Sequence, residues 1–185
     1  MKKKMTYREI FDEWMKVSRA RNVDHRSGTK AAIAQCRQFL ATTLLQAELE
    51  QARYYYLAQQ ICDHLWSHNI AHRTDETPGY PGHFGCRIRL RQRKLELSWY
   101  YNRFVAKKSG DGQRVFSEYI RKEGRYRYHS SAFARAQGWE KPRIMETEAG
   151  FEIVRKLNAN LAELRRIVRK GESLLNDLEE HLDGL

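Results

Sequence analysis

Four arginines stand at every second position of one short segment: Arg87, Arg89, Arg91 and Arg93. In a β-strand such residues share one face at a spacing of about 6.6 Å, close to the distance between phosphates along a nucleic-acid strand. An arginine fork bonds two phosphate oxygens or the O6/N7 edge of guanine. The row therefore predicts a strand that binds DNA. The alternative is an edge strand that its charges protect from aggregation, but four arginines without acidic residues between them favour binding.

Positive charge is concentrated in the same part of the chain. The 185 residues include 34 Lys and Arg against 23 Asp and Glu, a net charge of +11. Residues 86–145 hold 16 basic and 5 acidic side chains, which account for this whole excess. Such a field is typical of a protein that binds a polyanion, because neutralising phosphates releases their counterions. The pattern predicts a nucleic-acid partner, and composition alone does not separate DNA from RNA.

Further side chains extend the candidate interface. Ser98, Tyr100 and Asn102 would lie on the arginine face from the next strand. Residues 125–129 interleave arginines with tyrosines, which either stack on bases and grip a backbone or anchor a loop on the core; both interpretations stay open. The candidate DNA-binding residues are Arg87, Arg89, Arg91, Arg93, Lys94, Ser98, Tyr100, Asn102, Arg103, Lys107, Lys108, Arg114, Arg121, Lys122, Arg125 and Arg127.

One group of residues has the spacing of a small zinc site. His68, His72, His83 and Cys86 could supply four ligands around a Pro-Gly loop. No C-x-x-C pair supports a metal, and ordinary polar positions at the end of a helix explain the same residues. We therefore expect neither a metal nor another cofactor.

Catalytic patterns are also weak. The sequence has no Walker loop, G-x-S-x-G or dinucleotide-binding fingerprint. A small nuclease could use Glu96, Glu118 or His129, but such enzymes cluster carboxylates around a metal, and the acidic residues of segment 86–145 are scattered. We expect a binding protein that is not an enzyme.

Apolar residues recur at helical spacing in the part of the chain before this basic segment. This spacing predicts a short amphipathic helix over 6–21, a polar linker over 22–28, and one very long helix, or two in close succession, over 29–70. The turn-rich segment 77–82 ends this helical region.

The basic segment itself has strand periodicity. Residues 87–93 and 95–102 alternate as two strands of a hairpin, and 114–120 form a plausible third strand after a turn at 109–112. We expect a short helix over 131–139, capped by Ser130 or Ser131.

The last 40 residues have the clearest pattern. Apolar residues recur every seven positions and predict a coiled-coil helix, with Gly171 the one break in the seam. The seam consists of Val154, Leu161, Val168, Leu175 and Leu182, with Leu157, Leu164, Leu178 and Leu185 at the companion positions. Its partner is either the 29–70 helix, folding back antiparallel, or the same helix of a second subunit.

The fold class that follows is α+β and mostly helical. Long N-terminal and C-terminal helices form a coiled-coil-like stalk, and a small basic antiparallel sheet of about three strands, with a short helix, lies between them. We expect four parts: residues 1–28 (helix and linker), 29–76 (long helix), 77–145 (basic β head) and 146–185 (heptad helix).

Few cysteines and short apolar runs predict where in the cell the protein acts. Three widely spaced cysteines predict no disulfide framework and suit a reducing cytoplasm. No apolar run approaches the roughly 18 residues of a membrane span, and no hydrophobic signal region follows the basic N-terminus. We expect a soluble cytoplasmic protein that has no membrane partner.

Four segments together resemble a known family. The runs are 95–104 (LELSWYYNRF), 115–120 (VFSEYI), 132–140 (AFARAQGWE) and Thr147-Glu148, and they are similar to the MobI family of integrative conjugative elements and conjugative plasmids. The resemblance covers about residues 85–170 and carries no residue roles. It implies an accessory mobilisation factor that binds double-stranded DNA at the origin of transfer and assists the relaxase and other conjugation proteins. We expect the protein to be a homodimer. The alternatives to the DNA-binding function are an RNA-binding regulator or a small nucleic-acid-processing enzyme of a mobile element.

Overall fold

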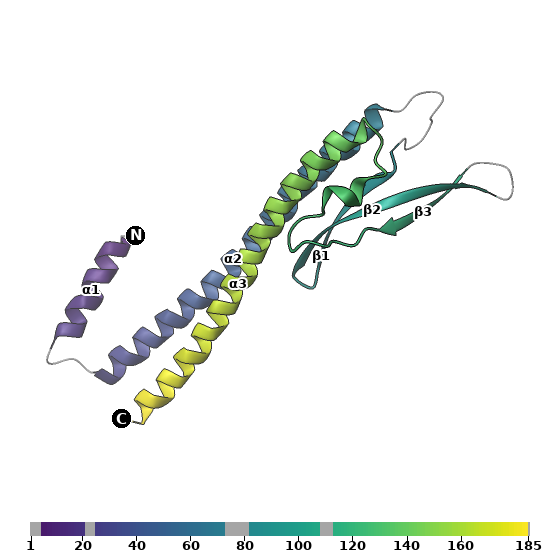
Figure 1. Cartoon of the computed structure of the whole chain (residues 1–185). Helices are drawn as coiled ribbons and strands as arrows, with labels where there is room; N and C mark the ends of the chain where they lie inside the picture. The colour runs from purple at the N-terminus through teal and green to yellow at the C-terminus, as the bar shows by residue number, and fades with distance from the viewer. Residues whose placement is uncertain (1–4, 21–24, 73–81, 108–112, 185) are drawn as a thin grey trace. The chain divides into compact units, whose positions relative to one another are not determined.

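The computed structural model describes residues 5–20, 25–72, 82–107 and 113–184. Figure 1 shows its elements. In chain order they are α1 (Tyr7–Arg19), α2 (His25–Ala71), β1 (Phe84–Arg91), β2 (Lys94–Ala106), β3 (Gln113–Tyr119), the 3-10 helix η1 (Ser130–Phe133) and α3 (Glu140–Asp183). Long helices therefore enclose a small antiparallel sheet in the sequence, which confirms the expected α+β class. The expected turn at 109–112 and most of the loop at 77–82 lie outside the described residues.

The chain divides into two compact units. The first consists of Met1–Thr43 and Arg169–Leu185, and the second of Leu44–Val168. The predicted division into four parts stays a prediction. Among the described residues, no helix has the length and apolar character needed to cross a membrane.

In the first unit, α1 starts with a capping box. The Thr6 hydroxyl accepts a hydrogen bond from the Glu9 amide, and the Glu9 carboxylate accepts one from the Thr6 amide. This bond to the carboxylate lowers the pKa of Glu9. The Trp14 indole of α1 donates to the Gln35 side chain at 3.0 Å, which ties α1 to α2.

The start of α2 and the end of α3 run side by side in the same unit. Arg37 forms an ion pair with Glu179 and donates to Asn176 at 3.0 Å. α2 begins at His25, so the linker expected over 22–28 is wrong for its last four residues. No proline or β-branched run in that stretch prevents helix formation.

In the second unit the sheet order is β1-β2-β3, with both pairs antiparallel. Leu95, Leu97 and Trp99 alternate along β2 and are buried, so one face of the sheet packs on the core between α2, α3 and η1 (Figure 1). We call this side the core face and the opposite side the basic face. Trp99 is fully buried, and Phe133 of η1 contacts it edge-on, with a ring distance of 5.1 Å.

A buried ion pair joins α3 to the sheet. The Arg155 guanidinium donates to both oxygens of Glu148, at 2.8 and 3.2 Å, and also to the Leu97 carbonyl at 3.1 Å. The same carboxylate accepts from the Trp99 indole at 2.7 Å and from the Tyr128 amide at 2.8 Å. Every partner needed to compensate two buried charges is present, so this network determines how α3 docks on β2.

The heptad prediction is correct in part. Val154, Leu161 and Val168 are buried, and α3 packs against α2 of the same chain, where the Gln51 amide donates to Asn158 at 2.7 Å. The antiparallel intrachain alternative therefore holds. Leu164 and Leu178 at the companion positions are exposed, however, and so is Leu182 on the seam itself. One neighbouring helix covers a single stripe of α3, and the companion positions lie at the margin of that stripe.

The expected helix at 131–139 is wrong in type and length. The chain forms only the four-residue η1, and its N-cap is His129, which makes no side-chain cap bond. α3 instead starts early, at Glu140, because the buried Glu140 carboxylate accepts from the amides of His83, Phe84 and Gln137 at 2.8, 3.2 and 3.0 Å. These bonds hold the chain just before β1 against the start of α3.

Candidate nucleic-acid interface

The arginine row is shorter than expected. β1 ends at Arg91, and Gln92 and Arg93 have positive φ values of 48° and 61°. Positive φ at both central residues is the geometry of a type I′ hairpin turn, which matches the twist of the flanking strands. Arg93 therefore leaves the strand face and forms an ion pair with Glu48 at 3.2 Å. The prediction of four arginines on one strand face is wrong for Arg93.

The other three arginines do lie together on the basic face. In the β1–β2 register, Arg87 is opposite Ser98, Arg89 opposite Glu96 and Arg91 opposite Lys94, and residues paired in this way share a face. All three arginines are exposed. No acidic residue stands within the row itself, but the hairpin register places Glu96 across from Arg89, within 3.9 Å of the Lys94 ammonium.

Two tyrosines continue the basic face. Tyr100 is paired with Tyr119 of β3, and their rings meet edge-on at 6.2 Å. Arg87 donates to the Tyr119 hydroxyl at 2.9 Å, which links all three strands across this face. Burial raises the pKa of Tyr100 to about 12, so its hydroxyl keeps its proton at neutral pH and remains a donor.

Gly85 makes room for the Tyr100 ring. A Cβ at Gly85 would come within 2.5 Å of that ring. We expect Gly85→Ala to displace the ring and lower the free energy of unfolding by about 1–3 kcal/mol, as overpacking does. Gly138→Ala is the control, because nothing lies within 4 Å of a Cβ there. Urea unfolding of both variants tests this prediction, and equal losses would contradict it.

Asn102 does not belong to an exposed interface. Only 5% of it is exposed. Its side-chain oxygen accepts from the Ser117 hydroxyl at 2.7 Å, and its backbone N–H donates to the His83 carbonyl at 2.7 Å. The structure therefore gives Asn102 a structural role, because its side-chain oxygen is bonded to β3 and little of the residue is exposed. Ser98 is half-buried and keeps its place on the basic face.

Other predicted residues lie on the core-face side of the hairpin. Arg103 is paired with Phe116, and Arg114 with Val105, one residue out of phase with the basic face. Arg103 is 3.9 Å from Glu118 in an exposed ion pair. The structure therefore does not unite these two arginines with Arg87. Lys107 is exposed just after β2, and Lys108 lies outside the described residues.

The segment after β3 brings more positive charge beside Lys94. Lys122 and Arg125 line a hollow of about 250 Å³ together with Lys94 and the edge of Arg155. Lys122 donates to the Arg125 carbonyl at 2.6 Å, and burial lowers the pKa of Lys122, with Arg155 contributing. Asn158 and Ala159 of α3 also line this hollow, so the cluster lies where β2 meets α3, next to Lys94.

The interleaved motif at 125–129 anchors a loop on the core, as one of its two interpretations expects, and contact of its arginines with nucleic acid stays a prediction. Tyr128 is buried and anchors the segment on the core. The Arg125 guanidinium lies 5.0 Å from the centre of the Tyr126 ring and remains exposed, and Arg121 is exposed as well. Arg127 is 3.8 Å from Glu152 of α3. The tyrosine anchors the segment while the arginines face solvent.

The candidate metal ligands separate into distinct contacts. The His72 ring stacks on Trp139 at 4.2 Å beside His68, whereas the His83 ring stacks on Tyr101 at 5.4 Å. The Cys86 thiol lies 3.1 Å from the Cys62 sulfur in the core. Within the described ranges, no three His, Cys, Asp or Glu side chains gather as a metal site.

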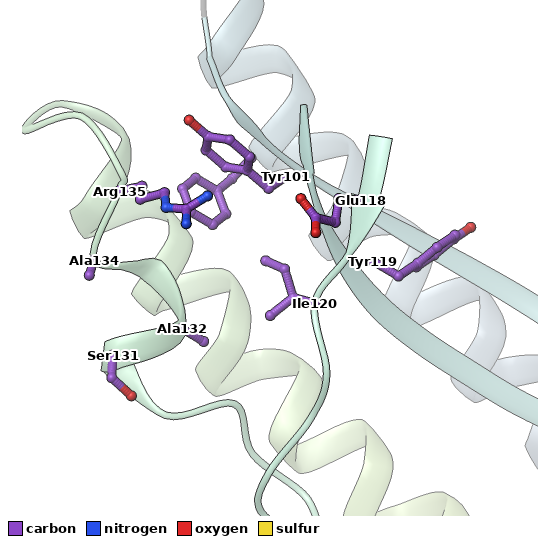
Figure 2. A pocket seen from close by; sticks show the side chains of 9 residues that line it. Tyr101, Glu118, Tyr119, Ile120, Ser131, Ala132, Ala134 and Arg135 are labelled. Carbon is purple, nitrogen blue, oxygen red and sulfur yellow. The ribbon is translucent and has the colours of Figure 1, made fainter. Parts of the chain in front are cut away.

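A pocket that periodicity alone did not reveal lies between the end of β3 and the η1 segment, where Phe84 and Tyr101 of the neighbouring strands also line it. Its volume is about 310 Å³, and Figure 2 shows Glu118 and Ile120 pointing into it while Tyr119 points away. Arg135 lies over the Tyr101 ring, 5.3 Å from its centre, on the opposite wall. Residues of the three strands and of the η1 segment line this pocket. These segments are distant in the sequence, and only the folded chain brings them together.

Comparison with known proteins gives one match. The sequence model of the family described as MobI protein matches residues 54–169, which is more than half of the chain. Neither curated proteins nor solved structures include a significant match. The matched range contains the sheet, η1, and the parts of α2 and α3 that cover the core face.

Proposed function

The chain belongs to the MobI protein family, which indicates a protein of conjugative mobilisation, and from this premise we propose that it binds double-stranded DNA at the origin of transfer and assists the relaxase there. It acts as a homodimer in the cytoplasm and recognises a particular DNA sequence. It binds without catalysis.

The basic face of the sheet is the observation that supports DNA binding best. Arg87, Arg89 and Arg91 project from alternate positions of β1 and are exposed. Lys94 lies opposite Arg91 and continues the positive charge at one end of the row, and Lys122 and Arg125 lie near Lys94 where β2 meets α3. A two-stranded ribbon fits the major groove, where arginine side chains reach phosphates and guanine edges.

A second candidate partner is single-stranded nucleic acid, including RNA. Tyr119 is 54% exposed beside Tyr100 on the same face, and aromatic side chains on a sheet are a stacking platform for unpaired bases. The arginine spacing suits either partner, so the tyrosines alone favour this alternative.

Competition between partners tests the proposal. Labelled duplex fragments are recovered with the full chain from a pool of random and conjugative-plasmid DNA, and the enriched duplex is then competed with its single strands and with structured RNA. We expect enrichment of one duplex sequence and displacement by duplex only. Displacement by single strands or RNA at equal concentration would favour the second candidate, and recovery without enrichment would contradict sequence recognition.

A further inference from the structure

The free edge of β3 is exposed and apolar. β3 has one neighbour in the described sheet, β2, so its other side presents backbone N–H and C=O groups. Val115, Phe116 and Tyr119 are 53%, 51% and 54% exposed. Proteins usually shield such an edge, because it pairs readily with another strand.

The charges of β3 are self-complementary. In an antiparallel pair of β3 strands with Phe116 opposite Phe116 of a second copy, Arg114 lies opposite Glu118, twice by symmetry. A shift of this register by two residues removes both charge pairs, because Arg114 and Glu118 then lie opposite uncharged residues. Opposite charges across strands stabilise a pair, so the charges select the centred register.

The centred register brings the arginine of the second copy to Glu118. Arg114, Phe116 and Glu118 lie on the core-face side of the strand, and residues paired across strands share a face. Arg114 of the second copy would thus arrive beside Glu118, one of the residues that line the pocket of about 310 Å³ in Figure 2. Within the described chain, Glu118 has only the long, exposed contact to Arg103, and no ion pair involves Arg114.

We propose that two copies of the chain dimerise by antiparallel pairing of their β3 strands. A continuous six-stranded sheet results, and its two-fold axis runs perpendicular to the sheet. The two basic faces therefore point to the same side and form one two-fold-symmetric surface. This last consequence rests on the proposed function, and it makes the partner a duplex with an inverted repeat.

Charge reversal tests the interface without DNA. Sedimentation equilibrium of the full chain should give twice the 22.0 kDa chain mass. Arg114→Glu places like charges opposite each other twice and should yield monomer, whereas Arg114→Glu combined with Glu118→Arg restores opposite charges and should restore the dimer. Circular dichroism should be unchanged in both, because both side chains are exposed. A monomeric wild type, a dimer that survives Arg114→Glu, or a double variant that stays monomeric would each overturn the proposal.

Binding measured separately distinguishes this interface from the proposed function. Glu118→Arg places arginines opposite each other twice and should also yield monomer. This monomer should retain binding to a duplex with one half-site and lose at least tenfold in affinity for the inverted repeat, because the second half-site no longer adds avidity. Equal wild-type affinity for one half-site and for the repeat would contradict the shared surface. A wild-type dimer that binds no duplex would contradict the proposed function, but it would still support the β3 interface.

Discussion

Glu148→Ala should lower the free energy of unfolding by about 3–5 kcal/mol, because it leaves the buried Arg155 guanidinium without its counter-charge. Glu148 is fully buried and also accepts from the Trp99 indole and the Tyr128 amide, so the variant loses four hydrogen bonds at the junction of α3 with the sheet. Urea unfolding followed by circular dichroism measures the loss.

Glu163→Ala is the matched control on the same helix. Glu163 pairs with Arg166 in an exposed contact, which contributes little in water. We expect its free energy of unfolding to be nearly unchanged. Because alanine is a better helix former than glutamate, helix propensity does not lower the stability of either variant. Similar losses in the two variants would contradict the role given to the buried network.

Replacing Arg89 and Arg91 with alanine together should weaken DNA binding about 100-fold. Each arginine contributes roughly tenfold, because a hydrogen bond to a charged group is worth about 1.5–3 kcal/mol. The slope of log K against log salt should become shallower by about 0.9 for each phosphate that the variant no longer neutralises. Fluorescence anisotropy over a series of salt concentrations measures both quantities. Stability should change by less than about 0.5 kcal/mol at each exposed position.

Arg53→Ala with Arg166→Ala is the control for total charge. These arginines are exposed on α2 and α3, so the pair removes the same charge as the first variant without touching the basic face. A retained slope and affinity in this control identify the basic face as the binding surface. If both double variants lose equal affinity, net charge alone explains binding and the assignment of the face is wrong.

Periodicity predicted the elements well and the site less well. Alternation in β2 correctly separated Leu95, Leu97 and Trp99 from the residues between them, although it failed at Asn102, which is buried. The seven-residue spacing of Val154, Leu161 and Val168 correctly indicated a long helix. Both signals are local, so a single segment contains them.

The errors came from information that is not local. The turn at Gln92–Arg93 contains neither Asn nor Gly, so nothing marked Arg93 as a turn residue with positive φ. Glu96 became a neighbour of Arg89 only through the register of the hairpin. The Glu148–Arg155 ion pair joins α3 to the sheet and is buried. The seven-residue spacing of apolar residues does not predict this burial, because charged residues off the seam usually lie on the exposed surface of a helix.

The most direct test of the central claim, that the basic face binds duplex DNA, is photocrosslinking to a duplex containing bromodeoxyuridine, with the crosslinked residue located by mass spectrometry. Tyr100 and Tyr119 lie among the arginines of the basic face, whereas Tyr101 is directed toward the core face. We predict crosslinks at Tyr100 or Tyr119 and none at Tyr101. Crosslinks confined to Tyr101 or to α2 and α3 would contradict it.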